Sequence, residues 1–276
     1  MFGAIPGLIF GLVVAAIAFG VVEWRWPGRR GQKRLRRGLL TDLGWYAFTP
    51  TLGKAFTGIV VAVSVIALAR IFGAGITAET LRAQTVRDTA ISHQPLALQL
   101  IEFLLLADLA GYWQHRAFHR VGRLWRFHAV HHSSTDVDWL SSVRVHPLND
   151  ALASTAVATP LLLLGFSPAA LAAYLPFLTL YAVMLHANVS WSFGPLRNVI
   201  SSPAFHRWHH SAEAEALDKN FAGLLPAVDW IFGTLYFPKD KLATVFGVNG
   251  EQLPASFLGQ LAYPFKRSKP LSEAAS

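Results

Sequence analysis

The chain of 276 residues contains no cysteine. This absence excludes disulfides, thiolate zinc sites, iron–sulfur clusters and cysteine nucleophiles. Charged residues are also scarce, at 14% against about 25% in an average soluble domain, while hydrophobic residues make up 53% of the chain. Such a composition excludes an intrinsically disordered chain and is typical of an integral membrane protein.

Apolar runs of membrane-spanning length are spread along the sequence. Residues 3–22 are uncharged and long enough to cross a hydrocarbon layer of about 30 Å. Residues 55–69 and 95–114 are further candidate spans, and the apolar stretch 150–188 is either two tilted spans or a re-entrant hairpin. We therefore predict an all-α, polytopic transmembrane bundle with about four to five spans.

The basic residues behind the net charge of +8 are clustered beside the apolar runs, as in the cytoplasmic loops of membrane proteins. Seven basic residues come directly after the first apolar run: Arg25, Arg29, Arg30, Lys33, Arg34, Arg36 and Arg37. A cleaved signal peptide carries its positive charge before the apolar stretch, so this run is predicted to be an uncleaved anchor with its N-terminus outside. The basic segments then lie in the cytoplasm. No recognition fold for nucleic acid is visible, and no nucleic-acid partner is expected.

Eight of the 11 histidines lie in three short groups that read HRAFH, HAVHH and HRWHH. Their members are His115, His119, His128, His131, His132, His206, His209 and His210. Residues three or four apart share a helical face, so each group can direct its imidazoles to one point. Neutral imidazole suits iron, zinc and copper. Eight imidazoles exceed the ligand set of one four-coordinate ion, so we predict two metal ions.

Four other residues are candidates for the same site. Asp108 lies on one helical face with the first histidine group, and we expect its carboxylate to hold a ligand imidazole. His186 ends an apolar run where the chain returns to the other groups and is predicted to be a ninth ligand, with Asn188 holding a water or an imidazole. His146 either supports the site or has a structural role. No Glu-x-x-His pair of the soluble di-iron type occurs in the chain.

The histidine groups and their flanks closely resemble the fatty acid hydroxylase (sterol desaturase) superfamily of membrane di-iron oxygenases. The matching segments are DLAGYWQHRAFH, LWRFHAVHHSS, RVHP, HAN and FHRWHHS, followed by DKNFA and VDWIFGTLYFP. The resemblance covers roughly residues 96–238. It implies a transmembrane bundle with a cytoplasmic histidine-rich helical cap, which carries two iron ions and uses O2 to hydroxylate or desaturate a C–H bond of a lipid.

The resemblance also implies a role for individual positions. The implied iron ligands are His115, His119, His128, His131, His132, His186, His206, His209 and His210. His146 matches a common family position without being assigned as a ligand. The domain organisation expected from it is an N-terminal transmembrane anchor region over 1–94, a catalytic domain over 95–240 and a C-terminal tail over 241–276.

The electrons are expected to come from a separate protein. The sequence has no cysteine, no haem-binding HPGG and no glycine-rich dinucleotide fingerprint. A reductase with a ferredoxin or a cytochrome b5 is the expected donor. The Ala- and Arg-rich sequence without an ER retrieval signal favours a bacterial inner membrane, with an ER membrane as the equivalent in a eukaryote.

Two other functions fit part of the pattern. One is a membrane metal transporter or metal-binding protein, but transporters place ligands near the bilayer midplane and often show repeated halves. Here the histidines adjoin basic, membrane-edge residues and no repeat is visible. The other is a family member that holds zinc and has lost catalysis. The sequence leaves the lipid and its reacting carbon open, and it favours hydroxylation over desaturation only weakly.

Overall fold

The computed structural model of the chain describes residues 4–71, 89–166 and 168–266. Within these ranges the regular secondary structure is helical, and the β-pairing is confined to two isolated bridges, Pro27 with Val189 and Ser211 with Phe246. The predicted all-α class is therefore confirmed.

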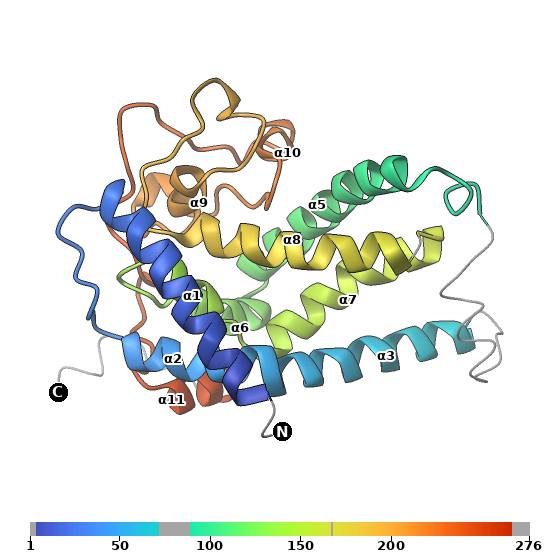
Figure 1. The fold of residues 1–276 in the computed structure, drawn as a ribbon, viewed down its shortest axis with the longest axis horizontal. Coiled ribbons are helices and arrows are strands. Elements are labelled where there is room, and N and C mark those ends of the chain that lie inside the picture. Colours follow the sequence, from blue (N-terminus) through green and yellow to red (C-terminus); the bar gives the residue numbers. More distant parts are fainter. Residues whose placement is uncertain (1–3, 72–88, 167, 267–276) are drawn as a thin grey trace.

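Four long helices extend together to one side of the molecule (Figure 1). They are α3 (Lys54–Ile71), α5 (Leu96–Arg120), α7 (Pro147–Leu164) and α8 (Pro168–His186). At 1.5 Å per residue their lengths are about 27 to 38 Å, close to the thickness of a hydrocarbon layer. α7 runs outward and α8 runs back (Figure 1), so the chain returns to the end where it left. Both interpretations of the stretch 150–188 required this return.

The N-terminal helix α1 (Ala4–Arg25) lies to the left of most of these helices in Figure 1 and runs obliquely to them. α2 (Leu39–Phe48) continues through a π-helical turn (Thr49–Gly53) into α3, at a proline that lacks the N–H for a regular helical bond. In the part of the chain that the structure describes, three helical segments are long and apolar enough to cross a membrane: Ile5–Arg25, Leu39–Ser64 and Leu96–Arg120. The chain has the helices of an integral membrane protein, and the count of four to five spans stays a prediction.

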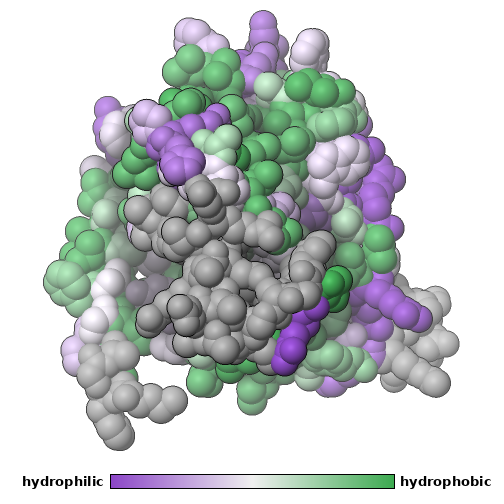
Figure 2. Space-filling view, turned by 90° about the vertical axis from the view of Figure 1, so that its right-hand side faces the viewer, coloured by the Kyte–Doolittle hydropathy of each residue, from purple (hydrophilic) through white to green (hydrophobic). Residues whose placement is uncertain are grey.

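The surface of the long helices fits a lipid environment. Figure 2, which looks onto their outer end, shows extended hydrophobic areas with hydrophilic residues at the edges. Large apolar side chains such as Ile17, Ile59, Leu105 and Leu180 are exposed along α1, α3, α5 and α8. Continuous apolar surface of this kind is rare on soluble monomers and is typical of a face that contacts lipid.

The helices pack through aromatic side chains. Phe103 of α5 makes edge-on contacts with Phe166 and Tyr174, with ring centroids 5.4 and 4.7 Å apart. Leu161 of α7 completes this buried cluster. These rings lie between α5, α7 and α8 and hold the outer parts of these helices together. The predicted ligands lie at the other ends of α5 and α8, more than three helical turns further along each helix.

The opposite end of the molecule is a cap of short helices and loops (Figure 1). It contains α6 (Gly122–His132), α9 (Pro203–His209), α10 (Pro226–Ile231) and α11 (Phe257–Ala262), together with the 3-10 helix η2 (Trp139–Val143). Their connections are long and irregular, so the cap depends on side-chain hydrogen bonds and ion pairs for its shape.

A buried ion cluster joins the basic segment to this cap. Arg36 contacts both Asp42 and Asp138 at 2.5 Å, and Arg144 also contacts Asp42. All four side chains are buried. Leaving one such charge without its partner costs about 3–5 kcal/mol. Arg36 therefore has a structural role in addition to the topological one predicted from the sequence.

Candidate metal centre

Four helices bring the predicted ligands to one place. The HRAFH group lies in the last turns of α5, HAVHH ends α6, and HRWHH occupies α9 and its C-cap. His186 is the last residue of α8. Helix ends from the bundle and from the cap therefore converge at the junction between these two parts.

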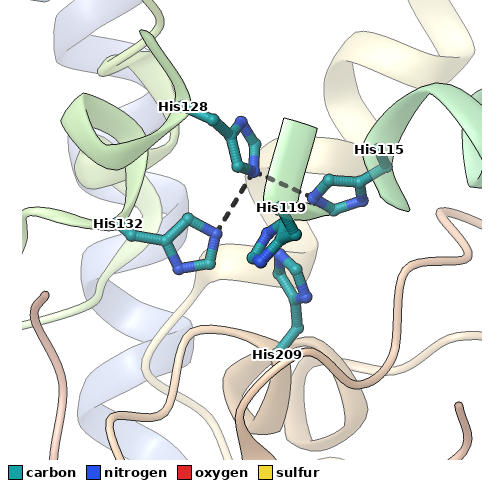
Figure 3. Close-up of side chains that lie close together, drawn as sticks. All are labelled: His115, His119, His128, His132 and His209. Carbon is teal, nitrogen blue, oxygen red and sulfur yellow. Dashed lines mark hydrogen bonds between the residues drawn. The ribbon is translucent and has the colours of Figure 1, made fainter. Parts of the chain in front are cut away.

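The nine histidines form two sets in which all ligand atoms lie within 4.8 Å of one another. The five-histidine set consists of His115, His119, His128, His132 and His209 (Figure 3). The four-histidine set consists of His131, His186, His206 and His210. Figure 3 shows the rings of the five-histidine set pointing toward a common centre. The prediction that the histidine groups and His186 meet is confirmed in geometry.

The two sets interleave along the sequence. In HAVHH the first and last histidines, four residues apart, face the five-histidine set, while the middle histidine faces the four-histidine set. In HRWHH the first and last histidines face the four-histidine set and the middle one faces the other. A separation of four places two side chains on one helical face, whereas adjacent residues such as His131 and His132 point about 100° apart around the helix. Each motif therefore supplies both sets.

Hydrogen bonds fix the tautomers in the five-histidine set. His115 donates its Nδ1–H to the carbonyl of Phe221 at 2.8 Å, and His128 donates its Nδ1–H to Oδ1 of Asn149 at 3.0 Å. Both Nε2 atoms then carry lone pairs, yet they lie 3.0 Å apart. Two acceptors at this distance repel one another unless a cation lies between them.

The four-histidine set repeats this arrangement. His131 donates its Nδ1–H to the carbonyl of Arg144 at 3.1 Å, and His186 donates to the carbonyl of Ala182 at 2.7 Å. Their Nε2 atoms face each other at 3.1 Å. In the described residues neither set includes a carboxylate. Each set therefore fits a cation that accepts imidazole ligands, such as iron, zinc or copper.

Two further nitrogens support this assignment. The Nε2 atoms of His119 and His209 are buried and lack a hydrogen-bond partner. A buried polar atom left unpaired costs about 1–3 kcal/mol. A metal ion at the centre of the five-histidine set would satisfy both.

Burial keeps the ligands in the form that binds metal. It lowers the pKa of six imidazoles in the cap well below the usual range: His128, His131, His132, His206, His209 and His210. Neighbouring imidazoles in the cluster lower these pKa values further, because each would repel a second positive charge. The rings are neutral near pH 7, as metal ligation requires.

The lowered pKa values predict acid sensitivity of the fold. Below the usual histidine pKa of about 6.5 the unfolded chain binds protons that the folded chain excludes. The free energy of unfolding should therefore fall as the pH drops below about 6.5 and change little from these groups at higher pH. Thermal unfolding of the detergent-solubilised protein between pH 5 and 8 measures this. A melting temperature that rises on acidification would contradict it.

One short segment orients most of the five-histidine set. Three imidazoles donate their Nδ1–H to residues 218–221: His119 to the Asp218 carboxylate at 3.3 Å, His209 to the Lys219 carbonyl at 2.9 Å and His115 to the Phe221 carbonyl at 2.8 Å. Such partners fix the ring orientation and increase ligand basicity. We call residues 218–221 the orienting segment.

The orienting segment has an unusual backbone that its neighbours hold in place. Asp218 and Asn220 have positive φ angles of 56° and 58°. Asn220 donates from its side chain to the carbonyls of Phe205 (3.2 Å) and Tyr236 (2.7 Å) and accepts from the Tyr236 N–H (2.8 Å). Asp229 accepts from the Phe221 N–H at 2.8 Å. These bonds stabilise a conformation that non-glycine residues rarely adopt.

Asp108 lies on the predicted helical face but does not hold an imidazole. Its carboxylate accepts from the backbone N–H groups of Leu224 (2.7 Å) and Leu225 (2.9 Å). Asp108 is about two helical turns before the first ligand of α5, so it reaches the chain that follows the orienting segment. Tyr112 on the same face bonds Thr234 at 2.9 Å. The whole face therefore anchors residues 218–234, which corrects the role expected for Asp108.

Of the two roles expected for His146, supporting the site or holding the fold together, the structure gives the second. Its Nε2 donates to the carbonyl of Leu261 at 3.1 Å, and its Nδ1 accepts the N–H of Leu148 at 3.2 Å. The ring is buried and packs against Phe127 and Phe265. It fixes the start of α7 against the end of α11.

Asn188 joins α8 to the N-terminal region and bonds no imidazole. Its Oδ1 accepts the N–H of Arg29 at 2.8 Å, and its own N–H donates to the Glu23 carboxylate at 2.8 Å. Of the two partners expected for Asn188, the imidazole is therefore wrong, and the water stays a prediction. Asn188 lies just beyond α8, where the chain passes the segment around Arg29, and its hydrogen bonds join these two backbone segments.

Sequence reasoning missed the residues that orient the ligands. Asn149 follows His146 within RVHPLN, and Asp218 begins the DKNFA segment. Similarity of DKNFA to the family was the only signal for this segment. The carbonyl acceptors carry no signal at all, because every residue type supplies a carbonyl.

The comparisons with known proteins agree with this geometry. Residues 100–234 match the family model of the fatty acid hydroxylases. Ornithine lipid hydroxylase from Rhizobium tropici is 32% identical over 69% of this chain and 60% of its own length. Human alkylglycerol monooxygenase is 36% identical over 51% of this chain and 31% of its own. A very-long-chain aldehyde decarbonylase from Oryza sativa is 29% identical over 48% and 22%.

The chain therefore belongs to the fatty acid hydroxylase superfamily, which confirms the resemblance carried by the histidine groups. It spans 60% of the length of the Rhizobium relative and about a third of the human one. No solved structure matches the chain. The matched residues lie within the range 95–240 expected for the catalytic domain, whose boundaries stay a prediction.

Proposed function

We propose that the chain is a membrane di-iron oxygenase that hydroxylates a C–H bond of a lipid, using O2 and electrons from another protein. The observation that carries this proposal is the pair of adjacent all-imidazole sets, each with Nε2 lone pairs directed at one another. The family match and the apolar helices that lead to the sets support it.

The five-histidine and four-histidine sets would each hold one iron ion. Bound iron would supply the reductive activation of O2 that cleavage of an unactivated C–H bond requires. The chain itself orients five of the ligands: the carbonyls of Lys219, Phe221 and Arg144 and the side chains of Asn149 and Asp218 bond one Nδ1–H each and so direct the Nε2 of that ring inward. Burial of the imidazoles keeps water away from this centre.

The substrate class follows from where the sets lie. α5 and α8 carry apolar side chains along their length and end at ligands of the two sets. An apolar lipid chain lying against these helices would be directed toward the metal centre. The names of the relatives include hydroxylation of ornithine lipids and oxygenation of alkylglycerols. We therefore favour hydroxylation of a membrane lipid, with the histidines on the cytoplasmic side of a bacterial inner membrane.

Comparative lipidomics tests this function against its alternatives. Cells that produce the protein should contain a lipid heavier by one oxygen, and the purified protein should contain about two iron ions per chain. The matched control is the His206→Ala protein at the same expression level, which should yield no such lipid. Metal uptake into sealed vesicles would support a transporter instead. Bound zinc without any lipid product would support an inactive member.

We also infer where electrons enter. His119 of the five-histidine set bonds Asp218, whose side chain is 37% exposed, and Arg120 lies 3.5 Å from the same carboxylate. Arg120 is exposed, as is Arg123 three residues further along the chain. A basic edge next to a route of hydrogen bonds to the metal fits an acidic donor, such as a ferredoxin or a cytochrome b5.

Charge reversal at this edge tests the inference. Arg123→Glu should raise the KM for an acidic donor about 10-fold and reduce its salt dependence, because rim charges act mainly on association. Turnover with dithionite as reductant should be unchanged. Arg70→Glu, at the far end of α3, is the matched control. Equal effects of the two substitutions would contradict an electron entry site at this edge.

A further inference from the structure

An apolar groove runs along the exposed side of α1, and none of the residues that line it belongs to the two histidine sets. Its volume is about 440 Å³, and its walls include Val13, Ile17, Val21 and Trp24. Arg34, from the basic segment after α1, lies at one end of the groove. An apolar channel that ends at a cation has the shape and polarity of a lipid site.

A second, polar pocket adjoins this end of the groove. Its volume is about 200 Å³, and it shares Trp24 and Arg34 with the groove. Its other walls include Arg29, Lys33 and Glu23. The two hollows form one amphipathic site, apolar along α1 and polar at the basic segment.

The charge available in the polar pocket is positive. Glu23 already accepts the N–H groups of Asn188 (2.8 Å) and Trp139 (3.1 Å). Asp138, which also lines the pocket, is paired with Arg36 in the buried ion cluster. Lys33 and Arg34 are exposed at the rim. The acidic groups and Arg29, which pairs with Asp136 at 3.2 Å, are thus engaged by the protein, whereas Lys33 and Arg34 are exposed.

The position of the Arg34 guanidinium beside the last turns of α1 fits the headgroup layer of a membrane. Arg34 donates to the carbonyl of Gly20 at 3.1 Å, about 7 Å before the end of α1. Trp24, which lines both hollows with Arg34, is 72% exposed, and Leu35, the next residue in the sequence, is 84% exposed. Exposed tryptophan and leucine beside basic residues are typical of the boundary between acyl chains and headgroups.

We propose that this site binds one anionic phospholipid, with an acyl chain along Val13–Val21 of α1 and the phosphate held by Lys33 and Arg34. The site is separate from the histidine sets, so this proposal stands apart from the oxygenase function. A bound lipid would brace the junction between α1 and the basic segment and should raise the thermal stability of the protein.

Native mass spectrometry of the full chain in detergent tests the proposal, with phosphatidylglycerol and phosphatidylcholine of identical acyl chains as probes. The wild-type protein should retain one phosphatidylglycerol under conditions that remove phosphatidylcholine. The double variant Lys33→Gln/Arg34→Gln should retain it about 30-fold less, because each basic residue near an anionic lipid contributes about a factor of five. Phosphatidylglycerol should also raise the melting temperature of the wild type more than that of this variant.

Two further variants distinguish binding at this site from non-specific attraction of lipid by the basic segment. Arg30→Gln/Arg37→Gln changes the net charge by the same amount on the same segment but at residues that line neither hollow, and it should retain the lipid. Ile17→Trp fills the groove without changing charge and should lose it. Equal retention of both lipids by the wild type, or equal loss from both double variants, would overturn the proposal. Iron content, measured on the same samples, reports the oxygenase site independently.

Discussion

Replacing His128 with alanine is expected to abolish turnover and to lower bound iron from about two ions per chain to about one. The Nε2 atom of His128 lies centrally in the five-histidine set, 3.0 Å from that of His115 and 3.2 Å from that of His132. Its removal opens the site and leaves Asn149 without its partner. Metal analysis and lipid product measured on the same preparation test this result.

The reciprocal variant, in the four-histidine set, tests whether the two sets bind metal separately. His206→Ala should remove the other iron and leave the five-histidine set loaded, since these residues belong to different sets. Turnover should again be lost, because the proposed reaction requires both ions. His93→Ala, at a histidine outside both sets, is the control and should retain metal and activity. Normal turnover in either ligand variant would contradict a two-iron reaction.

Replacing Asn220 with glycine is expected to lower activity by about 10- to 100-fold, the usual effect of losing groups that orient metal ligands. Asn220 touches no imidazole; its side chain holds the orienting segment through Phe205 and Tyr236. Glycine accepts the positive φ of this position without strain. The loss therefore reports the side-chain hydrogen bonds rather than backbone strain.

The iron release rate distinguishes positioning from general destabilisation. A chelator should remove iron faster from Asn220→Gly than from the wild type at temperatures well below unfolding. Asn249→Gly, which removes an exposed asparagine that donates to the Ala212 carbonyl, should leave the release rate unchanged. If Asn220→Gly lowers the melting temperature but releases iron at the wild-type rate, the segment does not orient the ligands.

The ligand positions could be predicted because their signal is local. Spacings of three and four within each histidine group predict that its rings gather on one side of a helix. The expectation that each group directs its rings to one point is corrected for HAVHH and HRWHH, because each of them divides its rings between the two sets. His186 was found from its position at the end of an apolar run. The all-α class followed from composition and run length for the same reason, since a membrane leaves few alternatives to helices.

The supporting contacts could not be predicted because their partners are distant in the sequence. Asp108 was placed on the correct face, but its acceptors, the amides of Leu224 and Leu225, lie 116 and 117 residues away. The ion pair of Arg36 with Asp138 spans 102 residues. A carboxylate in an apolar stretch of sequence indicates that it needs a hydrogen-bond partner. Which residue becomes that partner depends on how the cap folds.

Isotope labelling tests the central claim most directly. Iron-loaded protein is incubated with reductant, a lipid extract and ¹⁸O₂, and the masses of the lipid products are measured by mass spectrometry. The account predicts a lipid that carries one ¹⁸O atom, absent from both His128→Ala and His206→Ala. A wild-type protein that holds two irons and consumes ¹⁸O₂ but forms no labelled lipid would contradict it.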